Sequence, residues 1–317
     1  MNTRLSVEFD HRPSALAFML NALRPRRSLR SAGGFPPVVV RWRKHRVDRS
    51  QLLDFLQLTG LRADASLPII YPHVFGFRLQ MVVLTHPTFP IPIWSALQVR
   101  NHLHQHRPIP VDSVMNLETR VAGHRILEKG AEVDLHTTVS VGADLMWESL
   151  NTYYYRGRFG QPEAAVPLSN SPGIPAPVVA AWHVPSGFGW RFARMTGDYN
   201  GIHRWHWYAR LGGFQQAFFH PQMIAGQCMS HLPVADPEKP QCLDLWLKGP
   251  VYFNSDVSLR AATMENVTVF ALTLHGDERP VILGRWCGAD PQTMTSLSVD
   301  DSRYAGFQYA NPIISRA

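Results

Sequence analysis

The chain has 317 residues, of which 45% are hydrophobic and 17% are charged. This composition excludes an intrinsically disordered chain, and the length suffices for two ordinary domains. The net charge of +7 predicts a surface that attracts anionic groups, but charge alone does not distinguish nucleic acid, a membrane surface and a phosphate-bearing cofactor.

The N-terminal segment is basic, with Arg24, Arg26, Arg27 and Arg30 following a short apolar stretch. No nucleic-acid-binding motif accompanies these arginines, so we expect a basic extension over residues 1–46, either a solvated arm or a helix packed on the body, and no nucleic-acid partner. No apolar run approaches the roughly 18 residues of a membrane helix, so no membrane span is expected. The chain has three cysteines and no C-x-x-C pair, which favours a reducing, cytoplasmic location.

The first half of the chain predicts a helix and a hairpin. Leucines recur at helical spacing over residues 47–61, and Gly60 predicts the end of that helix. Apolar and polar side chains alternate over residues 132–141, as is typical of a strand. A turn at residues 142–144 and an aromatic-rich strand at residues 145–156 complete an antiparallel hairpin.

The middle of the chain is rich in proline, and strands are predicted again beyond it. Proline at this density blocks helices and sheet ladders, so residues 161–178 are interpreted as an extended linker. After the linker, residues 256–264, 266–274 and 281–286 have the Val and Thr content of strands. The middle one is apolar on both faces, which predicts a more buried strand, although periodicity alone also allows a helix there.

A faint internal repeat relates the two halves at an offset of 142 residues. It aligns Pro108, Asp112, Ser113 and Leu117 with Pro250, Asn254, Ser255 and Leu259. Together with the hairpins and the linker, the repeat favours duplication of one α+β unit, against the alternative of chance similarity. The predicted organisation is an extension over 1–46, one unit over 47–160, the linker over 161–178 and a second unit over 179–317.

The most informative motif lies in residues 192–213, which read FARMTGDYNGIHRWHWYARLGG. The segment before Asn200 predicts a tight turn, and residues 201–211 predict a helix that Asn200 caps. Asp198 precedes this helix and His203 lies in its first turn, so both side chains can face one pocket. A carboxylate and an imidazole that share a water form a general acid–base pair. The alternative is a capped turn with a surface histidine.

This stretch resembles the signature of the MaoC-like dehydratases and (R)-specific enoyl-CoA hydratases, in which S/T-G-D-x-N-P-I/L-H precedes an alanine and a Gly-Phe pair. Here it reads TGDYNGIH, followed by Ala209 and by Gly213 and Phe214. The resemblance implies a double-hotdog fold of the α+β class, in which two antiparallel sheets each wrap around a central helix. It also identifies residues 67–84 as the entry strand and central helix of a catalytically degenerate first hotdog.

The resemblance implies roles for four residues. Asp198 and His203 correspond to the catalytic pair, and Asn200 corresponds to the asparagine that holds the water or substrate. Gly226, in MIAGQCM, is the nearest equivalent of the glycine whose backbone N–H donates to the thioester oxygen. The sequence departs from the family where Gly201 replaces proline and where Ala225 replaces the histidine before that glycine. The segment AFFHPQ before Gly226 is interpreted as an insert.

The implied function is reversible addition of water to a trans-2-enoyl thioester in fatty acid metabolism, with the reverse reaction dehydrating a (3R)-hydroxyacyl thioester. No cofactor is implied, and the partner is an acyl-CoA or acyl carrier protein thioester. The first alternative is a non-catalytic hotdog module that binds acyl thioesters, and the second is a hotdog thioesterase. A single-chain double hotdog already resembles a dimer, so a homodimer of the chain is left open. The sequence does not decide which of Asp198 and His203 transfers which proton.

A second candidate site, outside this motif, is a run of three histidines. On a strand, His102, His104 and His106 would share one face, as in a metal site. Because neither a carboxylate nor a cysteine lies nearby in sequence, we expect a partly solvated strand and no metal.

Overall fold

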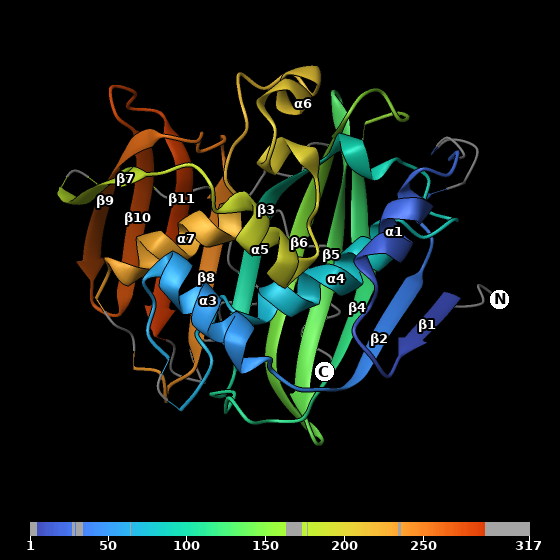
Figure 1. Cartoon of the computed structure of the whole chain (residues 1–317), viewed down its shortest axis with the longest axis horizontal. Coiled ribbons are helices and arrows are strands. Elements are labelled where there is room, and N and C mark those ends of the chain that lie inside the picture. The colour runs from blue at the N-terminus through green and yellow to red at the C-terminus, as the bar shows by residue number, and fades with distance from the viewer. Residues whose placement is uncertain are drawn as a thin grey trace.

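The computed structural model describes residues 5–26, 29, 34–63, 65–162, 173–175, 177–233 and 236–288. Their strands form one curved sheet of 11 strands in the order β1-β2-β4-β5-β6-β3-β8-β11-β10-β9-β7 (Figure 1). All neighbouring pairs are antiparallel except β1 and β2, which run parallel. The two predicted sheets therefore exist but join edge to edge.

The sheet consists of two units with the same internal order. The first unit contains β1 (Leu5–Phe9), β2 (Val38–His45), β3 (Ala96–Gln105), β4 (Met115–Leu127), β5 (Gly130–Val141) and β6 (Asp144–Arg156). The second contains β7 (Val178–Val184), β8 (Gln241–Leu247), β9 (Ser255–Met264), β10 (Val267–Leu274) and β11 (Pro280–Gly288). The order β2-β4-β5-β6-β3 in one unit corresponds to β7-β9-β10-β11-β8 in the other.

The two units meet where β3 pairs with β8. His102 lies opposite Asp244 in this ladder, and these two residues are 142 positions apart, the offset of the sequence repeat. Leu117 and Leu259, which the repeat aligns, lie in the corresponding strands β4 and β9. The structure therefore supports duplication of one α+β unit, related across the β3–β8 ladder by an approximate twofold axis.

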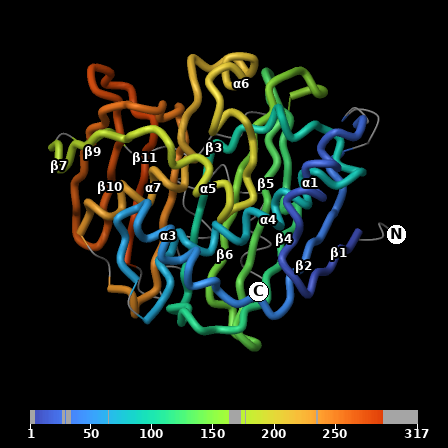
Figure 2. The backbone as a smooth tube through the Cα atoms, in the orientation of Figure 1, coloured from blue at the N-terminus to red at the C-terminus, as the bar shows by residue number. Residues whose placement is uncertain are grey.

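The larger helices lie on one face of the sheet, and the strands curve around them (Figures 1 and 2). The helical elements are α1 (Ala15–Ala22), α3 (Arg49–Thr59), α4 (Pro72–Leu84), η1 (Ile93–Ser95), α5 (Gly189–Thr196), η2 (Gly201–His203), α6 (His206–Leu211) and α7 (Pro221–Ser230). Helix α4 packs on β2, β4 and β5, and α7 packs on α3. These two helices are the central helices of the two units. None of the helices in the described ranges is long and apolar enough to cross a membrane.

Local sequence explains the two helices of the first unit. Helix α3 begins at Asp48, whose carboxylate accepts the N–H of Ser50 and Gln51, and it ends at Gly60 in the left-handed conformation. Helix α4 begins with Pro72 at its first turn. Twelve of its 13 residues are buried, so α4 is enclosed by the sheet and by other helices. Its apolar character on every side is the signature of a core helix.

Most of the predicted elements are confirmed. The helix at 47–61 is α3, the hairpin at 132–156 is β5 and β6, and the three later strands are β9, β10 and β11. The central helix of the first hotdog is α4, but the entry strand predicted before it is wrong. Residues 68–71 form a turn that leads directly into α4, because Tyr71 donates its N–H to the Pro68 carbonyl.

The predicted domain boundaries remain predictions. Strands β1 and β2 come from residues 1–46 and lie in the sheet beside β4, so part of the predicted extension belongs to the first unit. The linker at 161–178 falls largely outside the described residues.

Candidate active site

Asp198 lies in a loop that local side chains hold in place. Helix α5 ends at Gly197, whose φ of +83° places it in the left-handed region that glycine adopts without strain. The Thr196 hydroxyl then accepts the N–H of Asp198 at 3.1 Å, and Asp198 Oδ1 accepts the N–H of Asn200 at 3.0 Å. This carboxylate is therefore fixed through one oxygen, and Oδ2 is directed toward two imidazoles.

The segment after Asn200 departs from the single helix that the sequence predicts. Asn200 caps the short helix η2, its Oδ1 accepting the N–H of Ile202 at 3.3 Å. The chain then becomes extended at Trp205 before α6 begins. Gly201 and its neighbours have low helix propensity, and the Trp205 ring packs against Trp190 rather than along a continuous helix. The prediction of one helix over 201–211 was therefore wrong, although His203 keeps its predicted place.

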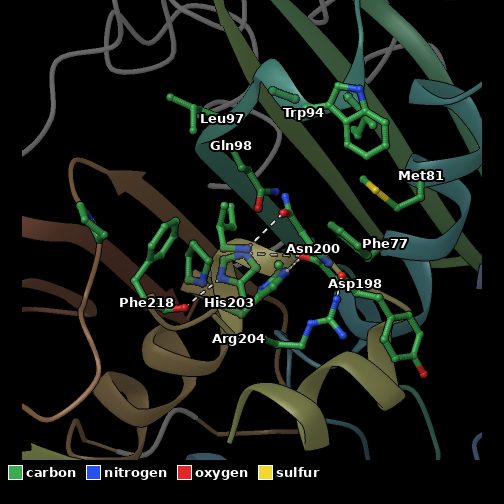
Figure 3. A pocket seen from close by; sticks show the side chains of 18 of the residues that line it. Phe77, Met81, Trp94, Leu97, Gln98, Asp198, Asn200, His203, Arg204 and Phe218 are labelled. Carbon is green, nitrogen blue, oxygen red and sulfur yellow. Dashed lines mark hydrogen bonds and ion pairs between the residues drawn. The ribbon is translucent and has the colours of Figure 1, made fainter. Parts of the chain in front are cut away.

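His203 has a defined tautomer. Its Nδ1 lies 2.9 Å from the carbonyl oxygen of Phe218, which can only accept a hydrogen bond. Nδ1 therefore carries the proton, and in the neutral ring Nε2 presents its lone pair to the site. That Nε2 lies 3.6 Å from Asp198 Oδ2, so a water molecule can touch both atoms (Figure 3).

A second imidazole, which the sequence analysis missed, completes the cluster. His220 is the N-cap of α7, and its Nε2 donates to Asp198 Oδ2 at 2.9 Å. The sequence signal was the proline that follows it, because proline at the first helical position indicates a helix start. The segment AFFHPQ was interpreted as an insert, and Ala225 as the replacement of a family histidine. The structure instead uses this segment to bring His220 to Asp198.

The site favours an ionised carboxylate beside a neutral imidazole. Burial opposes ionisation of Asp198, but the hydrogen bond from His220 and the nearby His203 ring hold its pKa well below the usual range. Burial lowers the pKa of His203 to about 4, against the opposing influence of Asp198. At neutral pH the pair therefore consists of an acceptor carboxylate and a base with a free lone pair.

The pair opens into a cavity of about 910 Å³. Asp198, Asn200, His203 and His220 all line it, together with apolar side chains from both units. Figure 3 shows Asp198, Asn200 and His203 together, and Phe77 and Met81 of α4 on the side toward the first unit. The structure thus brings together three of the four predicted site residues.

Gly226, the fourth predicted site residue, lies elsewhere. It is in the middle of α7, where an added Cβ would come within 2.6 Å of Thr59 Cγ2 on α3. It is absent from the residues that line the cavity in the described part of the chain. Gly226 therefore allows α3 and α7 to approach closely.

Arg204 lies at the cavity between two aromatic rings. Its guanidinium carbon is 4.4 Å from the centroid of Trp190 and 4.2 Å from that of Trp205. The same group donates to the Tyr199 carbonyl. Contacts with both rings fix the cation, so it presents a positive charge at the end of the cavity where Asp198 and His203 lie.

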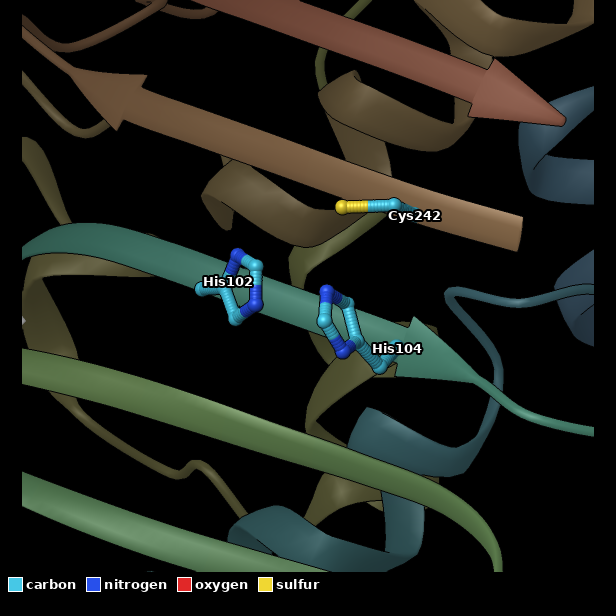
Figure 4. Close-up of side chains that lie close together, drawn as sticks. All are labelled: His102, His104 and Cys242. Atoms are coloured by element: carbon cyan, nitrogen blue, oxygen red, sulfur yellow. The ribbon is translucent and has the colours of Figure 1, made fainter. Parts of the chain in front are cut away.

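His102 and His104 of the histidine run lie on β3 and are buried, whereas His106 follows the strand and its side chain is 33% exposed. Figure 4 shows His102 and His104 beside Cys242 of the neighbouring strand β8. Their ligand-type atoms all lie within 4.8 Å of one another, although His102 Nδ1 also bonds to Asp244. His102 and His104 are only 5% and 2% exposed. The expectation of partial solvation was therefore wrong for His102 and His104, because the ladder with β8 places these two residues at the centre of the joined sheet, and it holds for His106.

The comparisons with known proteins support the predicted class. No family model matches the sequence. The chain is 29% identical over 223 residues to the 3-hydroxyacyl-thioester dehydratase X of Mycobacterium tuberculosis, a match that covers 66% of this chain and 79% of the relative.

Solved structures show the same fold. A crystal structure of HtdX from Mycobacterium tuberculosis has a TM-score of 0.67 at 24% identity and covers 79% of this chain and all of the other. A MaoC-like dehydratase from Phytophthora capsici has a TM-score of 0.65 at 14% identity, covering 81% and 96%. The peroxisomal multifunctional enzyme type 2 of Drosophila melanogaster has a TM-score of 0.61 at 15% identity, covering 80% of this chain and 48% of that one.

The fold is the double hotdog, and the predicted resemblance to the MaoC-like dehydratases is confirmed.

Proposed function

We propose that this chain is a (3R)-hydroxyacyl-thioester dehydratase, which in the other direction is an (R)-specific enoyl-thioester hydratase. The proposal rests on the Asp198–His203 pair, whose side chains are 13% and 10% exposed and face a largely apolar cavity. The similarity to a curated 3-hydroxyacyl-thioester dehydratase supports a hydro-lyase. The proposal includes no cofactor.

In the hydration direction the pair activates one water molecule. His203 Nε2 accepts a proton from the water, and the hydroxyl oxygen bonds to the β carbon of the enoyl thioester. The π electrons move toward the thioester carbonyl, and the imidazolium of His203 then delivers its proton to the α carbon, which restores the neutral ring. Asp198 holds the water through Oδ2 and stabilises the imidazolium that forms. Since both groups lie on one side of the substrate, the hydroxyl and the proton add to the same face.

The hydrogen bonds indicate that His203 is the general base and that Asp198 orients the water. His203 has its lone pair at Nε2 because Nδ1 donates to Phe218. Asp198 Oδ2 already accepts from His220, which makes that carboxylate a weaker base and keeps it ionised, so it orients the water rather than taking its proton. In dehydration neutral His203 first takes the α proton, and the imidazolium that forms then protonates the departing hydroxyl.

The negative charge on the thioester oxygen is best stabilised by the N-terminal end of α7. His220, Pro221 and Ile224 line the cavity, so this helix begins there. Pro221 has no N–H, so the first backbone donor of the helix is Gln222. The helix dipole adds partial positive charge at the same end. Gly226 is not proposed as the donor, because it lies in the middle of the helix.

The carrier is coenzyme A or acyl carrier protein, and Arg204 and Lys248 supply positive charge along the cavity for its phosphate groups. A cytoplasmic location and a homodimer also belong to this proposal. The three cysteines are free and buried, which agrees with a reducing compartment.

The test is hydration of crotonyl-CoA and of a longer trans-2-enoyl-CoA. The reaction is measured as the loss of absorbance of the conjugated thioester. We expect turnover by the wild type and a loss of about 10²- to 10⁴-fold in kcat for Asp198→Asn, with unchanged fold. Asp256→Asn is the matched control, because Asp256 forms an exposed pair with His183 at 2.8 Å outside the cavity. It should retain full activity.

Three results would contradict the proposal. Full activity in Asp198→Asn would remove the pair from the mechanism. Release of free coenzyme A, detected with a thiol reagent, would indicate a thioesterase instead. Tight binding of acyl-CoA and acyl carrier protein thioesters without any turnover would indicate a non-catalytic binding module.

A further inference from the structure

Helix α1 has an apolar stripe that faces outward. Leu16, Met19, Leu20 and Leu23 follow the i, i+3, i+4, i+7 spacing of one helix face. Leu16, Leu20 and Leu23 are 65%, 57% and 72% exposed, whereas Phe18 and Ala22 of the same segment are buried. Surface helices normally turn their apolar stripe toward the core, so this arrangement is the reverse of the usual one.

The stripe is continuous with the catalytic cavity. Its four residues line the same 910 Å³ space as Asp198 and His203. Across from them, Trp94 of η1 and Leu97 of β3 are 51% and 41% exposed and line it too. Of the 16 exposed large hydrophobic side chains in the described residues, seven line this one cavity. Such a concentration marks a binding surface.

Apolar side chains connect the stripe to the catalytic pair. Phe77 and Met81 are one turn apart on α4 and line the space between the two ends (Figure 3). Figure 3 shows Trp94, Leu97 and Met81 on one side of the pocket, with Asp198, His203 and Arg204 beyond Phe77. The charged lining residues are Asp198, Arg204 and Lys248, and none of them lies on α1, η1 or α4. The α1 end therefore suits hydrocarbon rather than phosphate.

Hydrogen bonds fix α1 in this position. Before the helix, Arg12 donates to the carbonyls of Arg194 and Met195 at 2.9 Å, and Arg78 donates to that of Pro13 at 3.0 Å. After the helix, Arg26 donates to the carbonyls of Asn21 and Thr85 at 2.7 and 2.9 Å. Helix α1 is thus tied to α4 and α5 before its start and to the end of α4 after it, and it forms a fixed wall.

From these observations we propose that α1, η1 and the start of β3 bind the distal part of a long acyl chain, so that the substrates are long-chain thioesters. This inference rests on the proposed function. The thioester lies at Asp198 and His203, and the chain runs past Phe77 and Met81 to the stripe. Each methylene buried there strengthens binding by up to about fourfold.

The experiment compares chain lengths in variants of the stripe. Leu16→Asp and Leu20→Asp place a charge on the apolar stripe, which with η1 and the start of β3 forms the proposed acyl groove. Both positions are exposed, so the fold tolerates the substitutions. Leu53→Asp is the matched control, because Leu53 is 66% exposed on α3 and does not line the cavity. Hydration of crotonyl-CoA and of trans-2-hexadecenoyl-CoA below its micelle concentration is measured for each.

In the wild type and in Leu53→Asp we expect kcat/KM to be at least about tenfold higher for the sixteen-carbon substrate. In Leu16→Asp and Leu20→Asp this preference should disappear through a rise in KM, while crotonyl-CoA turnover stays within about twofold. An unchanged preference in both variants, or an equal loss in Leu53→Asp, would overturn the proposal. So would a wild-type dimer that Leu16→Asp dissociates, since a second copy would then cover the stripe.

Calorimetric binding of hexadecanoyl-CoA separates this inference from the function on which it rests. Saturated acyl-CoA is not hydrated, so its binding reports on the groove alone. Binding weakened by Leu16→Asp but not by Leu53→Asp would support the groove even if no enoyl thioester reacted. If the wild type hydrates enoyl thioesters but Leu16→Asp binds hexadecanoyl-CoA as tightly as the wild type does, the proposed function stands and the acyl groove is rejected.

Discussion

At the scale of single residues, the proposed chemistry depends on the different contacts of the two carboxylate oxygens of Asp198. Oδ1 of Asp198 accepts a backbone N–H, and Oδ2 faces His203 and His220. The motif TGDYNGIH was enough to predict Asp198, Asn200 and His203, because turn and cap chemistry is local. His220 was missed because its contact with Asp198 spans 22 residues and depends on where α7 begins. Gly226 was chosen by motif alone, and tertiary packing against Thr59 explains that glycine better.

His220 should act as a positioning residue, and its substitution tests this. His220→Leu removes the hydrogen bond that lowers the pKa of Asp198, so we expect that pKa to rise and kcat to fall by about 10- to 100-fold. The acid limb of the pH–rate profile should then move to higher pH. His220→Gln, which keeps a donor near the position of Nε2, should recover much of the rate. If the acid limb of the pH–rate profile stays in place in both variants, His220 does not set the pKa of Asp198 and has only a packing role.

At the scale of elements, sequence periodicity predicted α3 and both hairpins because their caps, turns and alternation are local. It failed at residues 201–211, where packing of Trp205 on Trp190 interrupts the helix. It also failed before α4, where a turn replaces the expected strand. In both places tertiary contacts override local propensity.

Helix α4 includes a polar side chain without a partner. His73 is 1% exposed, and neither of its ring nitrogens has a hydrogen-bond partner among the described residues. Burial lowers its pKa to about 3, so the ring stays neutral. His73→Leu, of similar volume, should raise the free energy of unfolding by about 1–2 kcal/mol in urea denaturation. A destabilised variant would mean that His73 makes a contact that stabilises the fold.

At the scale of the whole molecule, duplication explains both the sheet and the site. The repeat at an offset of 142 predicted two units, but it carried no information on how they join. The β3–β8 ladder joins them, and the cavity lies between α4 of one unit and η2 and α7 of the other. In the proposed function, the first unit supplies a wall for the substrate and the second supplies the reactive groups.

The buried histidines should make the fold sensitive to mild acid. Burial lowers the pKa of His73 and His104 to about 3 and that of His203 to about 4, all below the usual 6.5. Between those values and pH 6.5 the unfolded chain binds protons that the folded chain does not. The free energy of unfolding should therefore fall as the pH drops from about 6.5 to about 4, by up to about 3 kcal/mol for a fully buried histidine.

Urea denaturation at pH 7.5 and pH 5.0 measures this dependence. We expect lower stability at pH 5.0, and a smaller difference in His73→Leu, which lacks one of these groups. Equal stability at the two pH values in the wild type would mean that the histidines keep their ordinary pKa values when folded.

The most direct test of the central claim is the dehydration of (3R)- and (3S)-3-hydroxyhexadecanoyl-CoA by the wild-type chain, measured as trans-2-enoyl-CoA formed. In the proposed mechanism the pair acts on one face of the substrate, and the resemblance of the TGDYNGIH motif to that of the (R)-specific enoyl-CoA hydratases implies that the (3R) thioester fits. We predict that the (3R) thioester alone gives the enoyl product and that Asp198→Asn abolishes the reaction. Dehydration of the (3S) thioester, or release of free coenzyme A without an enoyl product, would contradict the account.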